Sequence, residues 1–110
     1  QKIGMHKAAE LIFTGKKINA QTAFEYGLIN EVAPNGQGIE KGRELAKQLA
    51  NGPTKALGVA KRIMHQAAHL SLEEILELEA YGQSLIFQTR DFSEGRNAFV
   101  EKREARFLGY

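Results

Sequence analysis

The amino-acid sequence predicts a mainly α-helical chain, with about six helices and one short strand. Apolar residues recur every three to four positions through most of the 110 residues, which is the spacing of one helix face. Glycine, proline or a polar turn cluster separates one such pattern from the next. Only residues 28–33 combine β-branched side chains with a closing proline, as a short strand does. The predicted helices span about residues 2–13, 19–26, 39–50, 53–69, 72–88 and 93–103.

The first two helices are delimited by residues suited to helix ends. Gly15 and Gly27 stand where a helix C-terminus needs a left-handed residue, which glycine adopts without a Cβ penalty. Asn19 can accept from the free amides of the next turn. The first helix opens without a cap, and the chain begins at Gln1 instead of methionine. We therefore expect a fragment, a processed product or a truncated form instead of a complete natural protein.

The next boundaries are equally well marked. Gly52 suits the position just after a helix, and Pro53 suits the first turn of a new one. Ser71 and Glu74 match the capping-box pattern, in which each residue caps the backbone amide of the other. For the last helix, Asp91 or Ser93 is predicted to be the cap.

The helix predicted at 72–88 has an unusually wide apolar face. At about 100° per residue its apolar side chains cover well over half of the circumference. A chain of this size has only a modest core to bury such a face. We interpret the helix as lying between its own domain and a neighbouring subunit; the alternative is a central helix within one domain. Its apolar residues are Leu72, Ile75, Leu76, Leu78, Tyr81, Leu85, Ile86 and Phe87.

Composition excludes several function classes. Hydrophobic residues make up 43% and charged residues 25% of the chain, as in a soluble globular protein. A net charge of +2 with interspersed signs argues against a nucleic-acid binder. No apolar run approaches the ~18 residues of a membrane-spanning helix, so no membrane partner is expected. The absence of cysteine excludes disulfides, thiolate catalysis and cysteine metal sites.

Two polar clusters have residue types that can carry out chemistry. His65 and His69 have a spacing that allows two imidazoles to share a metal, but no glutamate follows the first and no third ligand is evident. Three of the glutamates in 73–79 lie in the first turns of a helix, where negative charge is favourable. Glu79 and Gln83 fall on the apolar face and are interpreted as a hydrogen-bonded polar pair. Spacing therefore predicts no catalytic residue and no metal site.

The C-terminal residues 99–107 interleave aromatic side chains with three cations. Cations beside an aromatic surface can hold a phosphorylated ring system. The alternative is an amphipathic tail whose charged face is simply solvated.

Four blocks of sequence together cover nearly the whole chain. They are A-E-L-I-F-T-G at 9–15; I-N-A-Q-T-A-F-E-Y-G-L-I-N-E-V-A-P at 18–34; Gly52-Pro53 with Ala56, Ala60 and Lys61; and Asp91, Glu94-Gly95, Ala98-Phe99 and Glu101-Lys102-Arg103. In this order they resemble the enoyl-CoA hydratase/isomerase (crotonase) family. The second block has Asn19 where the family usually has serine and Thr22 where glutamate is common.

The resemblance implies the C-terminal part of an enzyme that hydrates or isomerises enoyl-CoA thioesters. Its pathway stays open between fatty-acid metabolism and aromatic-acid degradation. It implies that the ββα spiral core, the oxyanion hole and the catalytic carboxylates precede this chain. Residues 1–34 would end that core, and residues 35–110 would form the helical trimerisation domain. By position in the fourth block, Phe99 and Lys102 would contact the coenzyme A of the substrate, and no other cofactor is implied.

The resemblance also implies partners and a compartment. A homo-oligomer is expected, either a trimer or a dimer of trimers, and cytoplasmic localisation, with the mitochondrial matrix or peroxisome open if the source is eukaryotic. The reading that competes with an enzyme fragment is a free-standing helical module that self-associates and catalyses nothing.

Overall fold

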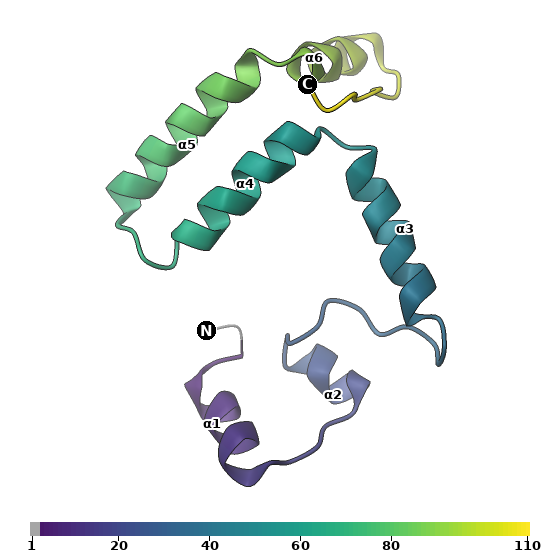
Figure 1. The fold of residues 1–110 in the computed structure, drawn as a ribbon, viewed down its shortest axis with the longest axis vertical. Coiled ribbons are helices and arrows are strands. Elements are labelled where there is room, and N and C mark those ends of the chain that lie inside the picture. Colours follow the sequence, from purple (N-terminus) through teal and green to yellow (C-terminus); the bar gives the residue numbers. More distant parts are fainter. Residues whose placement is uncertain (1–2) are drawn as a thin grey trace. The chain divides into compact units, whose positions relative to one another are not determined.

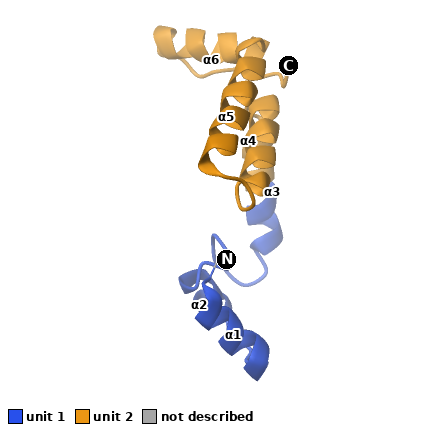
Figure 2. Ribbon diagram, turned by 90° about the vertical axis from the view of Figure 1, so that its left-hand side faces the viewer, with its two compact units in different colours: residues 1–43 blue, residues 44–110 orange. Residues whose placement is uncertain are grey.

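A computed structural model describes residues 3–110 and confirms the helical class (Figure 1). The chain divides into two compact units, residues 1–43 and 44–110 (Figure 2), and each is described by itself. The domain boundary after residue 34 stays a prediction. The helices are α1 (Met5–Thr14), α2 (Ala20–Glu25), α3 (Gly38–Ala50), α4 (Thr54–Gln66), α5 (Leu72–Phe87) and α6 (Arg90–Glu101).

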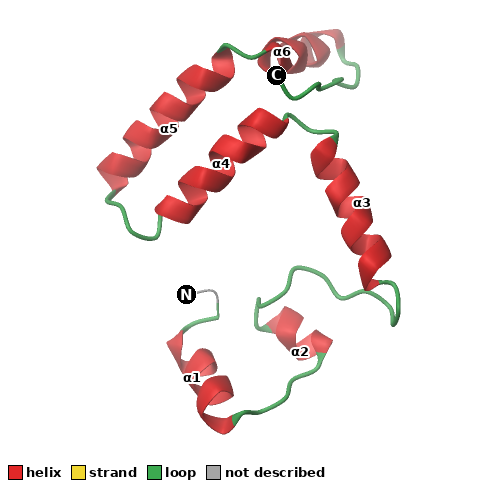
Figure 3. Cartoon of the chain, in the orientation of Figure 1, coloured by secondary structure: helices red, strands yellow, loops and turns green. Residues whose placement is uncertain are grey.

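The predicted strand at 28–33 is wrong. Residues 28–33 form turns and irregular backbone, and Figure 3 shows no strand anywhere in 3–110. The reason is pairing: a strand satisfies its backbone groups on a neighbouring strand, and no described segment offers one. Ile29 and Val32 consequently remain exposed, although their β-branched side chains produced the strand pattern.

In the first unit the predicted helix ends are confirmed. Gly15 ends α1 in the left-handed region, at φ 61°, and its amide donates to the carbonyl of Leu11. The Asn19 side chain accepts from the amide of Thr22 at 2.8 Å and caps α2. Gly27 follows α2 at φ 74°, again left-handed. Local sequence chemistry therefore determines both ends without help from distant residues.

A cation–π contact joins the two helices of this unit. The ammonium of Lys7 on α1 lies 4.2 Å from the centroid of the Tyr26 ring, which caps the end of α2. Such a contact at an exposed site contributes about 0.5–1 kcal/mol. It ties together two short helices that bury no side chain fully.

The second unit is built on α4 and α5, which lie side by side (Figure 1). Gly82 of α5 is buried at the crossing, and a Cβ added there would lie 2.7 Å from Val59 Cγ1. The helices approach each other this closely because the position lacks a side chain. Ile75, Leu78 and Ile86 are half-buried on the same side of α5. Gly82 therefore permits α4 and α5 to pack closely.

The start of α5 forms as predicted, whereas the ends of α4 differ. The Ser71 and Glu74 side chains form the complete capping box. Gly52 is not left-handed, and Pro53 is the residue before α4 instead of lying in its first turn. The helix ends at Gln66, three residues earlier than predicted. Its last three predicted residues form a turn instead.

Candidate functional site

The predicted site lies on α6, which begins earlier than its sequence pattern indicates. Thr89 is the cap, because its hydroxyl accepts from the amide of Phe92 at 3.1 Å. Neither Asp91 nor Ser93 is the cap, so that prediction is wrong. Both lie inside the helix, and tertiary structure gives the Asp91 carboxylate another use.

Asp91 fastens the C-terminal end of the chain against the start of α6. Its two carboxylate oxygens accept from the amides of Leu108 and Gly109 at 2.7 and 2.8 Å. Its own amide donates to the carbonyl of Tyr110 at 3.1 Å. The residue is only 4% exposed, and these amides satisfy a carboxylate that would otherwise be costly to bury. The chain after α6 therefore runs back along the helix.

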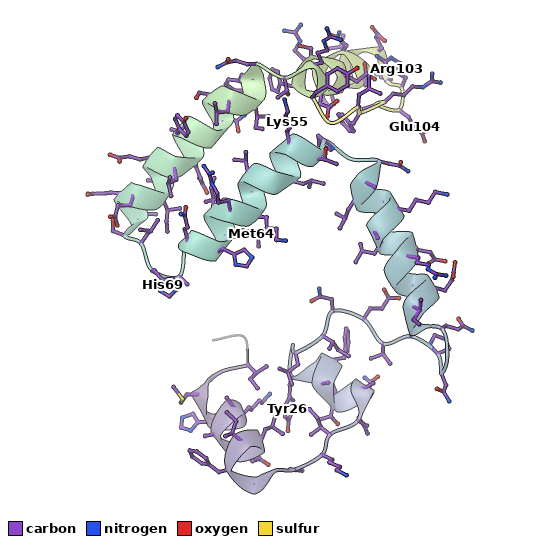
Figure 4. The ribbon with its side chains drawn as sticks, viewed as in Figure 1. Tyr26, Lys55, Met64, His69, Arg103 and Glu104 are labelled. Atoms are coloured by element: carbon purple, nitrogen blue, oxygen red, sulfur yellow. The ribbon has the colours of Figure 1, made fainter. Side chains whose placement is uncertain are left out.

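Glu94 makes a second attachment one turn further along α6. Its carboxylate receives two hydrogen bonds from the Arg103 guanidinium, at 2.6 and 2.9 Å, and one from the amide of Arg106 at 2.8 Å. The Arg103 hydrogen bonds, followed by the Arg106 amide, lower the pKa of Glu94 to about 2. Figure 4 shows Arg103 on the segment that follows α6. We call residues 103–110, held by Asp91 and Glu94, the returning tail.

Gly95 of α6 faces the same tail. A Cβ added at Gly95 would lie 3.4 Å from the ring of Phe107. A larger side chain at this position would push the tail away from the helix. Ala98, one turn further along, is 3% exposed and is the buried apolar residue of the described chain. Most residues of the fourth sequence block therefore help to hold the end of the chain against α6.

Phe99 and Lys102, the two residues predicted to contact coenzyme A, do not hold the tail with their side chains. The Phe99 side chain is 85% exposed. Lys102 is exposed too, and its ammonium makes no ion pair with any residue in 3–110. Its amide donates to the carbonyl of Phe99 at 3.3 Å, so the two residues lie one turn apart at the end of α6. An aromatic ring and an unpaired cation thus remain available here.

The other polar clusters form no site. His65 lies in the last turn of α4, but His69 lies beyond it, in the turn before α5 (Figure 4), so the two do not share a helix face. Within 3–110, no group of three potential metal ligands occurs. Glu79 and Gln83 line an open groove of about 380 Å³ between α4 and α5. The hydrogen bond predicted between them does not form.

The exposed apolar surface is a second candidate feature. On α5, side chains flanking the α4 contact are exposed, and Leu72 is 71% exposed. A further apolar groove, of about 540 Å³, runs beside α4 and includes Leu57 and Met64. Large exposed apolar areas mark interaction surfaces. On α5 the exposed apolar residues are Leu72, Leu76, Tyr81, Leu85 and Phe87.

Sequence reasoning missed the returning tail. The signal lay in the fourth block, where acidic residues recur on one helix face before a basic segment. The hydrogen bonds that Asp91 accepts from amides 17 and 18 positions away cannot be predicted from local patterns. The Thr89 cap was within reach of the sequence, since threonine is a good N-cap.

Known proteins match this chain along nearly its whole length. A family model described as enoyl-CoA hydratase/isomerase matches residues 1–109. The enoyl-CoA isomerase/hydratase of Mycosarcoma maydis is 36% identical over 107 residues, covering 97% of this chain and 39% of that protein. The 1,2-epoxyphenylacetyl-CoA isomerase of Escherichia coli is 33% identical over 106 residues, covering 96% of this chain and 40% of that protein.

A solved structure agrees with these matches. The crystal structure of an enoyl-CoA hydratase from Bacillus anthracis is similar with a TM-score of 0.90 and 36% identity, covering 99% of this chain and 42% of that one. The chain therefore spans about two fifths of the length of the relatives that it matches.

Proposed function

This chain belongs to the enoyl-CoA hydratase/isomerase family, and from that premise we propose that it is the C-terminal helical part of an acyl-CoA-processing enzyme. The reaction is hydration of an enoyl-CoA thioester or migration of its double bond, through an enolate held in an oxyanion hole. Such chemistry needs oriented amides and proton-transferring carboxylates. These groups belong to the rest of the enzyme. The described residues contribute to substrate binding and assembly.

Coenzyme A is bound in part by Phe99 and Lys102. One observation supports this proposal. The acidic residues of α6 bind the returning tail, whereas Phe99 and Lys102 at the end of the helix are exposed to solvent. An ammonium is a suitable donor to phosphate, and an aromatic ring can flank a purine or the acyl chain. The substrate is thus an acyl-CoA, with no further cofactor.

Replacing Lys102 tests this role. In the complete enzyme, Lys102→Ala should weaken acyl-CoA binding roughly tenfold, because it removes one charge-assisted contact. The loss should shrink at high salt, which screens an exposed charge. Lys47→Ala, which removes an exposed lysine from α3, is the control and should leave affinity unchanged. Equal affinities for Lys102→Ala and the unmodified enzyme at low salt would exclude this contact.

The exposed apolar side chains of α4 and α5 form a subunit interface in a trimer or a dimer of trimers. Burying apolar surface contributes about 25 cal/mol per Å², and a single chain leaves much of it in water. Sedimentation equilibrium should show the chain associating with itself. A well-folded monomer at all concentrations would contradict the assembly role.

The exposed apolar faces equally favour a second candidate, a helical module that only assembles subunits. A turnover assay separates the two. The complete enzyme should hydrate or isomerise a short enoyl-CoA, and residues 1–110 alone should not. An assembly protein would show no turnover even in its complete form.

The compartment stays a prediction. Every helix within residues 3–110 is too short or too polar to span a bilayer. From the family relationship we propose a cytoplasmic enzyme. Fractionation of cells that express the complete protein would test this.

A further inference from the structure

Lys102 has an unusual backbone conformation. At φ 53° and ψ 42° it is left-handed, and it is the one residue other than glycine with positive φ in 3–110. This conformation is unfavourable for an L-residue, because Cβ approaches the neighbouring carbonyl. Glycine usually takes this position at a helix end. A lysine here must be held by its surroundings.

The residues on either side of Lys102 provide that restraint. The Arg103 guanidinium donates to Glu101 at 2.5 Å and to the carbonyl of Glu104 at 3.1 Å, besides its two bonds to Glu94. The amide of Arg103 also donates to the carbonyl of Ala98 at 3.0 Å. One planar side chain thus joins the residue before Lys102 to the residues after it.

Glu94 anchors this arrangement to the body of α6. Besides Arg103 it accepts from the amide of Arg106, so it ties two residues that follow the turn to the helix. The carboxylate stays ionised at neutral pH, since its pKa is about 2. A bidentate arginine–carboxylate pair fixes geometry as well as charge.

We propose that Glu94 and Arg103 are positioning residues for acyl-CoA recognition, whose ion pair holds the turn at Lys102 so that its ammonium and the Phe99 ring meet the phosphorylated nucleotide together. This inference rests on the proposed function. Neither Glu94 nor Arg103 contacts the ligand. They act by reducing the conformations that Lys102 must give up on binding.

The exposure of the pair separates this role from a purely stabilising one. The Arg103 and Glu94 side chains are 40% and 24% exposed, and ion pairs in contact with solvent contribute little to global stability. Breaking the pair should therefore loosen the turn more than it unfolds the protein. Breaking the pair should mainly weaken the affinity for the nucleotide end of the substrate.

Two substrates and two variants test the proposal in the complete enzyme. For a short enoyl-CoA, Glu94→Gln should raise KM roughly threefold with kcat unchanged, because only binding loses preorganisation. For the matching enoyl-pantetheine thioester, which lacks the nucleotide, KM should not change. Arg103→Lys keeps the charge but loses the bidentate geometry, and should behave like Glu94→Gln. An equal rise in KM for both substrates would indicate a structural role and overturn the proposal.

A matched control tests whether the loss of a negative charge alone changes KM. Glu104 lies next to Arg103 (Figure 4), and its carboxylate makes no hydrogen bond within 3–110. Glu104→Gln deletes the same charge and should leave KM for the enoyl-CoA unchanged. If it raises KM as Glu94→Gln does, the pair is not the cause.

A double-variant cycle separates this inference from the function on which it rests. Glu94→Gln should add almost nothing when Lys102 is already alanine, because the restraint acts through Lys102. If Lys102→Ala itself is silent, the proposed function fails. If Lys102→Ala raises KM and Glu94→Gln does not, only the positioning role fails.

Discussion

The α4–α5 pair and α6 with its returning tail solve the same packing problem by opposite means. The two long helices meet through apolar side chains, at the close approach permitted by Gly82. The tail is held on α6 mainly by hydrogen bonds, most of them from backbone amides and an arginine to Asp91 and Glu94. Apolar contact is non-directional, whereas each of these hydrogen bonds requires one geometry.

The difference accords with the two roles proposed above, assembly for the helices and recognition for the tail. Apolar helices can add another layer on their open sides, and several apolar side chains of α5 are exposed. The tail instead gives a defined backbone turn at Lys102, where a charge is presented in one place. Apolar contacts are non-directional and tolerate small changes in geometry, whereas a hydrogen bond does not.

Filling the helix crossing should have the largest effect. Gly82→Val places side-chain atoms where Val59 Cγ1 already lies within 2.7 Å of the new Cβ. Overpacking of this kind should lower the free energy of unfolding by about 2–3 kcal/mol, measured by urea denaturation. Gly58→Ala on α4 is the control: nothing lies within 4 Å of its Cβ, and it should stabilise by about 0.5–1 kcal/mol. A neutral Gly82→Val would show that the helices are not in tight contact.

Removing the buried carboxylate should have a smaller and more local effect. Asp91→Ala deprives the amides of Leu108 and Gly109 of their acceptor, at a cost of about 2 kcal/mol. Hydrogen exchange should accelerate at those two amides and not in α4 or α5. Asp91→Asn, with one carbonyl oxygen left, should be intermediate. Uniform acceleration through the whole second unit would contradict the separation of the two regions.

The smallest effect concerns the exposed ion pair, and it should depend on pH. The folded pKa of Glu94, about 2, lies below its ordinary value of 4.5. Its contribution to stability is therefore complete above about pH 4.5 and is lost as the pH falls through about 2. The difference in Tm between the protein and Glu94→Gln should follow the same course. A difference that is constant with pH would show that the carboxylate charge is not what stabilises the tail.

Local patterns predicted most helices and several of their ends. Asn19, Gly15 and the Ser71 capping box were correct because each acts on amides or carbonyls within four residues. The strand at 28–33 failed because its pattern needs a partner strand, which is not a local property. The prediction that Asp91 caps the helix failed for a related reason. Its carboxylate would suit a helix start, but it accepts a hydrogen bond from an amide far along the chain.

The sequence by itself determined the helical class, the wide apolar face of α5 and the identity of Phe99 and Lys102 as candidates. Those features depend on periodicity, on cap chemistry within one turn and on motif position. Only the tertiary structure decided which acidic residues bind the tail and which cation remains unpaired. The physical reason is that burial and pairing depend on which segments meet in space. Lys102 and Arg103 are adjacent cations in the sequence, yet Arg103 pairs with Glu94 whereas Lys102 forms no ion pair within residues 3–110.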